Sequence, residues 1–516
     1  MSSNPESPSD SSQSILLALV LITILGAGLW KSYGASFQAW RELNEWKLTA
    51  MFAVCAVALA VLLTTVVWNL FVKSCGDSSV TEKDETSVLL GIDESGAEVH
   101  LKQSFRISHT QIIGTTNAGK TESVILPWAI RDIESGAGLL IVDGKGDRSF
   151  LDKLYAYVAK SKRTDSFKLF SLAHIEPSST FNPLMGGTAT EVSQRVFSSF
   201  PIEHPHYRAT QSVMFQALLT LILDKKKLPT FQLVHSMLSD APTLDAWLKD
   251  YELINKGNCS FLNAFNKLPR NERSNEVSGL NANLMPFVYG PTAALFNSTE
   301  PQIDFDAALK NRQICYFQLP TMYCPFLAEA TGKLVLQCFQ QAVAKRQLHG
   351  EENPGFFSCF LDDFQDYIYP GFGALLNKSR SANIGVVFSH QALGDLDKVG
   401  PEFRNVVTTC TNVKVVMRTT EPETCEFYAK TFGTESDHKV TERQTRGLIF
   451  TNKTGEGSVR DVEKYVIHPN TIRRLERGQG IVSIPHPSGV KLQTVRFKMR
   501  PNLSPVTLPP IDKKTS

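Results

Sequence analysis

Residues 114–121 read GTTNAGKT and match the spacing G-x-x-x-x-G-K-T. In this pattern backbone N–H groups surround phosphates, the lysine reaches the β- and γ-phosphates, and the last hydroxyl binds Mg²⁺. Lys120 and Thr121 stand at these two positions. A short apolar segment, 111–113, precedes the loop, and a segment able to form a helix, 122–130, follows it. The pattern predicts a phosphate-binding loop for ATP and Mg²⁺.

The whole loop and the residue after it are predicted to contact the nucleotide, since the backbone of such a loop wraps around phosphates. These residues are Gly114, Thr115, Thr116, Asn117, Ala118, Gly119, Lys120, Thr121 and Glu122.

A second chemical feature is a pair of carboxylates at the end of an apolar segment. Residues 356–363 read FFSCFLDD, so Asp362 and Asp363 follow six residues typical of a buried strand. A nucleotide-hydrolysing enzyme needs carboxylates at such a strand end, one for the Mg²⁺ shell and one for the attacking water. We therefore assign Asp362, with Thr121, to the metal and Asp363 to the water.

The elements that must position these residues are short apolar segments rich in β-branched and aromatic residues, as expected for strands of a parallel sheet buried on both faces. They alternate with helical patterns in two blocks, which are separated by a purely helical stretch. The pattern predicts an α/β fold: a phosphate-binding-loop domain interrupted by an all-helical insertion. The predicted strands after 111–113 are 139–142, 167–172, 314–317, 356–361, 384–388, 413–417 and 480–484.

Two apolar runs, 15–30 and 48–72, suggest an N-terminal transmembrane helical hairpin, although the first is slightly short for a membrane span. A single span by the second run is the alternative. The basic residues of the connection, Lys31, Arg41 and Lys47, would favour a cytoplasmic connection. An ATP site requires the following domain to be cytoplasmic, so a hairpin would place the connection outside.

Composition sets further limits. The chain has 53 Lys and Arg against 51 Asp and Glu, so any contact with nucleic acid must come from a local patch. Candidate basic residues are Lys225 to Lys227, with Arg270 and Arg273 farther along. The nine cysteines include no C-x-x-C pair, which favours reduced thiols over a metal site.

The ordered set of motifs resembles the coupling proteins of type IV secretion and conjugation systems, the TraG/TraD-like family of membrane-anchored, hexameric, FtsK-related ATPases. Besides the loop and the acidic strand end, the resemblance rests on segments found in family order over nearly the whole chain. These are IVDGKGD, FNPL, ICYFQLP, KSRSANIG, SHQALGDL and NVKVVMRTTEPETCEFYAKTFG.

The resemblance implies a RecA-like nucleotide-binding domain and site roles for individual residues. Gln391 matches the family's γ-phosphate-sensing glutamine, and Arg380 matches the arginine that a neighbouring subunit inserts, with Arg418 as the competing candidate. Asp363 stands where family members commonly have Glu. Asn117 replaces a usual Gly, and Asn is the non-Gly residue that best tolerates positive φ, so the loop is expected to remain intact.

The implied function is an ATP-driven motor that moves relaxase-linked single-stranded DNA into a type IV secretion channel. Secretion of protein effectors by the same machine is an alternative, and so is a nucleotide-binding membrane receptor with little turnover. Implied partners are DNA, the relaxase complex, channel proteins and five further copies of the chain in a hexamer.

The implied location is the bacterial inner membrane, as a multi-pass protein with most of the chain in the cytoplasm. The predicted organisation is a cytoplasmic tail (1–14), transmembrane helices (15–30 and 48–72) joined by an extracytoplasmic loop (31–47), a nucleotide-binding domain in two parts (73–183 and 298–500), an all-α domain (184–297) and a flexible tail (501–516).

Overall fold

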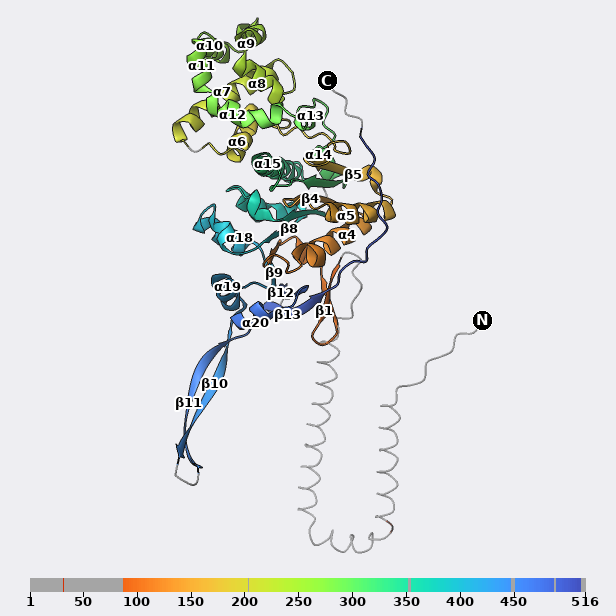
Figure 1. Ribbon diagram of the computed structural model, residues 1–516, viewed down its shortest axis with the longest axis vertical. Helices are drawn as coiled ribbons and strands as arrows, with labels where there is room; N and C mark the ends of the chain where they lie inside the picture. Colours follow the sequence, from red (N-terminus) through yellow and green to blue (C-terminus); the bar gives the residue numbers. More distant parts are fainter. Residues whose placement is uncertain are drawn as a thin grey trace, which may run out of the picture. The chain divides into compact units, whose positions relative to one another are not determined.

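The computed structural model describes residues 31, 87–202, 204–350, 354–446, 451–486 and 489–511. A mixed sheet of eleven strands organises this part of the chain, in the order β2-β1-β13-β12-β9-β3-β8-β7-β4-β6-β5 (Figure 1). Its strands are β1 (Val88–Asp93), β2 (Glu98–Leu101), β3 (Thr110–Ile113), β4 (Gly138–Asp143), β5 (Phe167–Ser171), β6 (Ile314–Gln318), β7 (Phe357–Asp362), β8 (Ile384–His390), β9 (Val413–Met417), β12 (Gln479–His486) and β13 (Gly489–Phe497).

The seven strands from β9 to β5 run parallel to their neighbours. Every residue of β3, β4, β6, β7, β8 and β9 is buried. Continuous apolar runs are what strands covered on both faces require, so these predicted strands are confirmed. Because they are parallel, their carboxyl ends meet at one edge of the sheet.

The other four strands are antiparallel and extend the sheet beyond β9. The predicted strand 480–484 lies in β12, but β12 pairs antiparallel with both β9 and β13, so its assignment to the parallel sheet was wrong. A short apolar run carries no information on strand direction. β1, β2 and β13 were not predicted; β13 has mostly exposed or half-buried residues and lacks a continuous apolar run.

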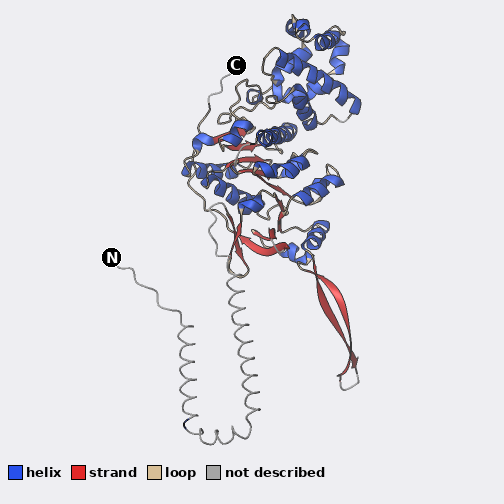
Figure 2. Cartoon of the chain, turned by 180° about the vertical axis from the view of Figure 1, so that it is seen from behind, coloured by secondary structure: helices blue, strands red, loops and turns tan. Residues whose placement is uncertain are grey.

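Helices cover both faces of the sheet (Figure 2). Leu139 and Ile141 of β4 belong to one core cluster, whereas Leu140 and Val142 belong to another, as the alternation of side chains along a strand requires. The first cluster includes residues of α4 (Leu126–Glu134) and α5 (Arg148–Lys160). The second includes residues of α14 (Phe305–Lys310), α15 (Pro325–His349), α16 (Phe372–Lys378) and α18 (Pro401–Cys410).

The chain between β5 and β6 forms helices and connecting loops, without strands, in its described residues. Buried aromatic residues such as Phe215, Phe231 and Phe287 form its interior, and Phe231 and Phe287 have ring centroids 4.6 Å apart. Besides α14, which packs on the sheet, the α-helices of this stretch form a helical insertion: α6 (Ala189–Ser199), α7 (Pro205–Asp224), α8 (Phe231–Ser239), α9 (Ala241–Leu248), α10 (Lys256–Asn266), α11 (Arg270–Glu276), α12 (Ser278–Val288) and α13 (Ala293–Phe296).

Two further features follow the parallel sheet. α19 (Pro422–Phe432) and α20 (Pro469–Arg474) flank a separate antiparallel hairpin of β10 (Thr434–Arg446) and β11 (Thr451–Tyr465), which the sequence did not predict. Residues 501–511 form neither helix nor strand. The Tyr157 hydroxyl donates to the Pro501 carbonyl over 2.6 Å, and the Ile511 N–H donates to the Glu176 carbonyl over 3.1 Å.

The predicted localisation as a multi-pass membrane protein is corrected by the structure. Across the described residues, no helix combines the length and the apolar character that crossing a bilayer requires. The longest one, α15, contains Glu329, Lys333, Lys345 and Arg346 and packs into the core beside the sheet. The two apolar runs on which the hairpin prediction rested, 15–30 and 48–72, lie outside the described residues.

Candidate functional site

The predicted phosphate-binding loop leaves the carboxyl end of β3 and enters a helix that begins with a π-helical turn, η1 (Lys120–Ile125), and continues as α4. Asn117 has a φ of 68° and Gly119 a φ of 102°. Asn117 therefore takes the left-handed conformation that its replacement of Gly was expected to require. A Cβ on Gly119 would lie 2.9 Å from the Ser123 hydroxyl oxygen and 3.3 Å from the Gly478 nitrogen, so this position is also sterically restricted.

The ends of three other strands hold the loop in place. The Thr115 N–H donates to the carbonyl of Arg418 after β9 over 2.9 Å, and the Gly114 N–H donates to the carbonyl of His390 at the end of β8 over 3.3 Å. The Gly478 N–H, just before β12, donates to the Ala118 carbonyl over 3.0 Å. The backbone of the loop is thus positioned by the sheet as well as by its own sequence.

Lys120 is buried beside the loop, and its amine donates to the carbonyls of Gly114 and Thr115 over 2.7 and 3.4 Å. Burial lowers the pKa of this amine, while the carboxylates of Asp363 and Asp362 oppose that shift. Both nearby acids favour the charged form. A cation therefore stands at the mouth of the loop, where phosphate oxygens would be neutralised.

Thr121 and Asp362 lie together although 241 residues separate them. The Thr121 hydroxyl donates to Oδ2 of Asp362 over 2.5 Å, and the Ser389 hydroxyl donates to Oδ1 over 2.6 Å. Burial, and then the neighbouring Asp363, raise the pKa of Asp362, whereas the two hydroxyl bonds lower it. A cation bound at this carboxylate would relieve the cost of burying its charge.

The donor set fits Mg²⁺. This ion is usually held by one or two protein oxygens together with phosphate oxygens and waters, not by an all-protein cage. One hydroxyl and one carboxylate in contact at the phosphate-binding loop are the arrangement expected.

The two other predicted carboxyl-edge residues also face the site. Asp363 follows β7 with a φ of 48°, a conformation that non-Gly residues adopt rarely. The amide oxygen of Gln391, just after β8, accepts a hydrogen bond from the Thr116 hydroxyl over 3.3 Å. Gln391 thus joins the carboxyl end of β8 to the loop.

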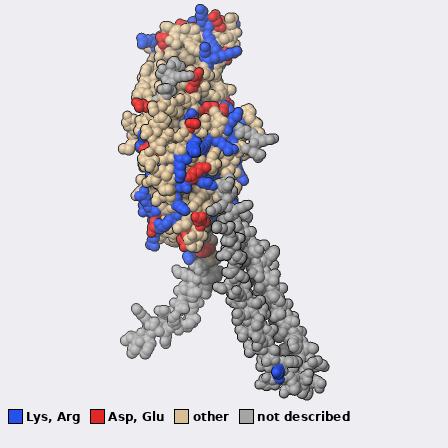
Figure 3. Space-filling model, turned by 90° about the vertical axis from the view of Figure 1, so that its right-hand side faces the viewer, with Lys and Arg blue, Asp and Glu red and all other residues tan. Residues whose placement is uncertain are grey.

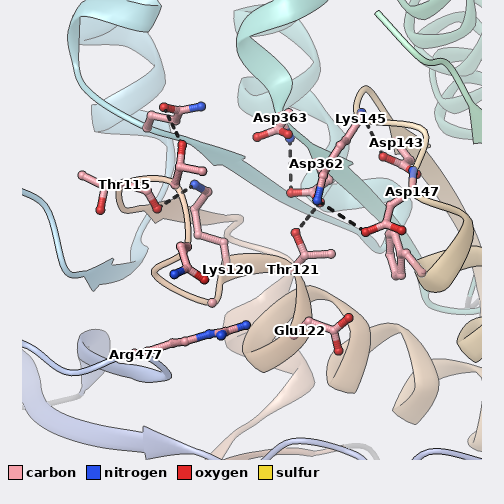
Figure 4. Close-up of a pocket in the computed structure, with 15 residues that line it drawn as sticks. Thr115, Lys120, Thr121, Glu122, Asp143, Lys145, Asp147, Asp362, Asp363 and Arg477 are labelled. Carbon is pink, nitrogen blue, oxygen red and sulfur yellow. Dashed lines mark hydrogen bonds and ion pairs between the residues drawn. The ribbon is translucent and has the colours of Figure 1, made fainter. Parts of the chain in front are cut away.

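These side chains surround a cavity of about 410 Å³ (Figure 4). Gly114 and Ala118, which were predicted to contact the nucleotide, do not line it; both are buried behind the other loop residues. The lining residues are Thr115, Thr116, Asn117, Gly119, Lys120, Thr121, Glu122, Asp143, Lys145, Asp147, Phe150, Asp362, Asp363, Gln391 and Arg477.

Several of the lining residues were not assigned from the sequence. Asp143 ends β4 in register with Asp362 of β7, and it accepts the N–H groups of Lys145, Gly146 and Asp147 over 3.0 to 3.1 Å. Burial and the nearby Asp362 raise the pKa of Asp143 to about 7. In the sequence this segment, IVDGKGD, contributed only to the family resemblance, and no role was assigned to Asp143.

The two candidate arginines lie elsewhere. Arg380 is exposed in η5 (Ser379–Ala382), before the first residue of β8, so it lies at the edge of the sheet opposite the loop. Arg418 is half-buried and contributes its backbone carbonyl to the loop, but its side chain does not line the cavity. Within one chain, the structure brings neither guanidinium into the site.

Comparison with known proteins agrees with this architecture. A family model described as the TraM recognition site of TraD and TraG matches residues 357–477. The type 4 coupling protein DotL of Legionella pneumophila (strain Philadelphia 1) is 23% identical over 421 residues, covering 70% of this chain and 53% of DotL. The chain therefore spans about half the length of that curated relative.

Solved structures of the bacterial conjugative coupling protein TrwB share the fold. The unbound form superimposes with a TM-score of 0.59 at 14% identity, over 81% of this chain and 90% of that one. The complex of the plasmid coupling protein TrwB with ADP and Mg²⁺ gives 0.58 at 15% identity, over 80% and 91%.

The fold and the site define a protein with the α/β architecture of phosphate-binding-loop nucleoside triphosphatases. More particularly, the family model, the curated relative and the shared fold confirm the resemblance to type IV coupling proteins.

Proposed function

We propose that this chain is a coupling ATPase of a type IV secretion system that hydrolyses ATP to move a substrate into the secretion channel. The observation that carries the proposal is the contact of Thr121 with Asp362 at the phosphate-binding loop, which joins the two elements that an ATPase of this class requires. Its support is the likeness to a type 4 coupling protein and to a conjugative one.

In this proposal Thr121 and Asp362 hold Mg²⁺, which would neutralise charge on the phosphates when bound. Lys120 binds the β- and γ-phosphates. Asp363 orients the attacking water, and Gln391 contacts the γ-phosphate from the end of β8. Asp363 lines the cavity, so its shorter side chain still faces the space in which the water would lie.

Arg380 completes the site in trans in this proposal. Its side chain forms no hydrogen bond or ion pair with the other residues that the structure describes. A guanidinium on the surface, far from the chain's own loop, is available to the loop of a neighbouring subunit. Hydrolysis would then require assembly into a ring, for which we propose a hexamer.

The proposed cargo is single-stranded DNA linked to a relaxase, and the proposed contact lies in the helical insertion. Lys225, Lys226 and Lys227 line a hollow of about 580 Å³ together with Trp247. Lysines beside an aromatic ring suit phosphate contact and base stacking. Arg273, by contrast, is buried and donates to Asn266 and Ser239, so it serves the insertion's own structure.

A local patch is needed because the surface is not uniformly basic. On the face shown in Figure 3, basic and acidic side chains are interspersed, in line with the near-balance of charges in the chain. Binding of DNA through Lys226 and Lys227 should therefore involve few phosphates and show a shallow salt dependence.

The test is ATP hydrolysis by the purified full chain as a function of protein concentration, with and without single-stranded DNA. We expect a rate that rises more steeply than linearly with concentration, is stimulated by DNA, and is abolished by Lys120→Ala. A Lys226→Ala/Lys227→Ala variant should need more DNA for half-maximal stimulation, while Lys310→Ala, on α14 outside the insertion, should not.

Each result bears on a different part of the proposal. Absence of hydrolysis in the wild type at all concentrations would contradict the ATPase. Hydrolysis that DNA does not stimulate, but a protein substrate does, would replace DNA by a protein cargo.

A further inference from the structure

Two cations that line the cavity, Lys145 and Arg477, have no role in the proposed function, and the Lys145 amine is already paired with Asp147 over 3.4 Å. Arg477 lies in the turn between α20 and β12 and lines the cavity. Its guanidinium has no hydrogen-bonding or ion-pair partner in the part of the chain that the structure describes. The neighbouring acid does not neutralise it, because the Glu476 carboxylate pairs with Arg496 over 2.5 Å.

The turn that carries Arg477 is fixed to the phosphate-binding loop. Gly478, the next residue, donates its N–H to the Ala118 carbonyl over 3.0 Å and accepts the Phe497 N–H over 2.9 Å. Its φ of 75° suits glycine, and its nitrogen lies where a Cβ on Gly119 would be in tight contact. The side chain of Arg477 thus extends from a backbone held at both the loop and β13.

The position of Arg477 relative to the loop indicates which part of a nucleotide it would meet. Asp362 and Asp363 lie on one side of the loop, and Arg477 extends along the other side towards the first turn of the helix (Figure 4). In a loop of this kind the lysine serves the β- and γ-phosphates and the hydroxyl serves the metal. The γ-phosphate end is therefore on the side of the carboxylates, and the opposite side receives the α-phosphate and the nucleoside.

We propose that Arg477 binds the α-phosphate of the nucleotide held by its own chain. The chemistry is a charge-assisted hydrogen bond from guanidinium to phosphate. Glu122, the acid at the same end of the loop, is paired with Lys153 over 2.9 Å, so it does not compete for Arg477. The inference rests on the proposed nucleotide site. It adds a residue that binds the α-phosphate, which ATP and ADP have in common.

The experiment is equilibrium binding of ATP and ADP, in the presence of Mg²⁺, to the full chain and to Arg477→Gln and Arg477→Lys variants. We expect Arg477→Gln to weaken ATP and ADP equally, on the order of tenfold, as the loss of one charged hydrogen bond predicts. Arg477→Lys should recover part of the loss. Arg474→Ala, which removes an exposed arginine of α20 that does not line the cavity, is the matched control and should bind as the wild type does.

The alternatives give different patterns. Weaker binding of ATP alone would place Arg477 at the γ-phosphate and overturn the proposal. Equal losses of affinity in the Gln and Lys variants would also overturn it, because they would indicate that the guanidinium stacks on the base instead of binding a phosphate through its charge. Unchanged binding in Arg477→Gln would remove Arg477 from the site while leaving the nucleotide site itself. A wild-type chain that bound neither nucleotide would instead contradict the proposed function. Thermal unfolding of each variant would verify that the fold is retained.

Discussion

The parallel sheet has an amino edge, where its strands begin, and a carboxyl edge, where they end. Both edges carry buried charged groups, but the surroundings of these groups differ. At the amino edge, Arg106 before β3 forms two hydrogen bonds of 2.6 Å to Asp132 of α4 and one of 3.1 Å to Ser358 at the start of β7. At the carboxyl edge of the same strands, Lys120 and Asp362 face a cavity of about 410 Å³.

The difference separates structural charges from functional ones. At the amino edge, both terminal nitrogens of Arg106 and both carboxylate oxygens of Asp132 are hydrogen-bonded within the chain, while the Nε of Arg106 has no hydrogen-bond partner in the part of the chain that the structure describes. A buried charge is tolerated only when it is paired and hydrogen-bonded. At the carboxyl edge, the Lys145 amine pairs with Asp147 over 3.4 Å, whereas the guanidinium of Arg477, which lines the cavity, has no partner among the described residues. The burial of a charged group does not by itself identify a functional site. A charged side chain that lines a cavity and lacks a partner within the chain does.

Arg380 is the exception at the amino edge, because it is exposed and lacks a partner among the described residues. If it acts in a neighbouring subunit, Arg380→Ala should lower the rate of ATP hydrolysis on the order of 10³-fold without lowering the unfolding temperature. Lys378→Ala, which removes an exposed neighbouring cation, should leave the rate unchanged. The measurement is steady-state hydrolysis at a concentration at which the wild type is assembled.

Mixing provides the sharper form of this prediction. Arg380→Ala and Lys120→Ala subunits, each inactive alone, should regain activity together, because a mixed ring contains sites with Lys120 from one chain and Arg380 from the next. Failure to regain activity in verified mixed assemblies would show that Arg380 does not act in the site of a neighbouring subunit and is an ordinary surface residue.

The buried pair of Arg106 and Asp132 should contribute to the stability of the fold and not to ATP hydrolysis. Asp132→Asn leaves the Arg106 charge buried without its partner and should lower the free energy of unfolding by about 3 to 5 kcal/mol. Denaturant unfolding would measure this. Replacing both partners by Leu should cost less than the single change, because no unpaired charge remains. An equal or larger loss in the double variant would show that the loss in Asp132→Asn does not come from an unpaired buried charge.

The amino edge should also show a pH dependence. Nδ1 of His109 accepts the Val386 N–H over 3.2 Å, and its other ring nitrogen lies 2.8 Å from the Leu376 carbonyl. Burial lowers the pKa of His109 to about 4. Below pH 6.5 the unfolded chain takes up a proton that the folded chain refuses until about pH 4, so stability is lost as the pH falls through this window.

His109→Asn, which can still accept the Val386 N–H, should reduce that loss between pH 6.5 and 4 by up to about 3 kcal/mol. The measurement is denaturant unfolding of both proteins at each pH. The loss should not vanish, since burial also lowers the pKa of His390 to about 4. Identical pH profiles for the two proteins would show that folding does not lower the pKa of His109.

The smallest effect is expected at Asn117 in the loop. Asn117→Gly keeps a residue that accepts a φ of 68°, so we expect nucleotide affinity within about twofold and stability within about 1 kcal/mol of the wild type. Asn117→Val should weaken nucleotide binding more, because a β-branched residue resists this conformation. Equal affinities in the Val and Gly variants would show that the loop does not need positive φ on binding.

The sequence predicted the carboxyl edge better than the amino edge, for a physical reason. Each buried parallel strand is a continuous apolar run. Asp362 ends one of these runs, Gln391 follows another strand, and Thr121 closes the loop after a third, so their meeting at one edge follows from strand direction. The pairing of Arg106 with Asp132 has no such signal, because it depends on how a helix and a loop pack in three dimensions.

Arg477 and the hairpin of β10 and β11 were missed for related reasons. The approach of the turn at Arg477 to the phosphate-binding loop depends on β12 being antiparallel to β9, which a short apolar run cannot reveal. The hairpin pairs only with itself, so it lacks the continuous apolar run that identifies a strand of the parallel sheet.

The central claim is that the carboxyl edge is a site for ATP and Mg²⁺ built by Thr121 and Asp362 together. It is tested most directly by equilibrium binding of ATP to the wild type and to Asp362→Asn, each over a range of Mg²⁺ concentrations. The account predicts saturable binding by the wild type that strengthens as Mg²⁺ is added, and loss of this strengthening in Asp362→Asn. Binding that responds equally to Mg²⁺ in both proteins, or no saturable binding by the wild type, would contradict it.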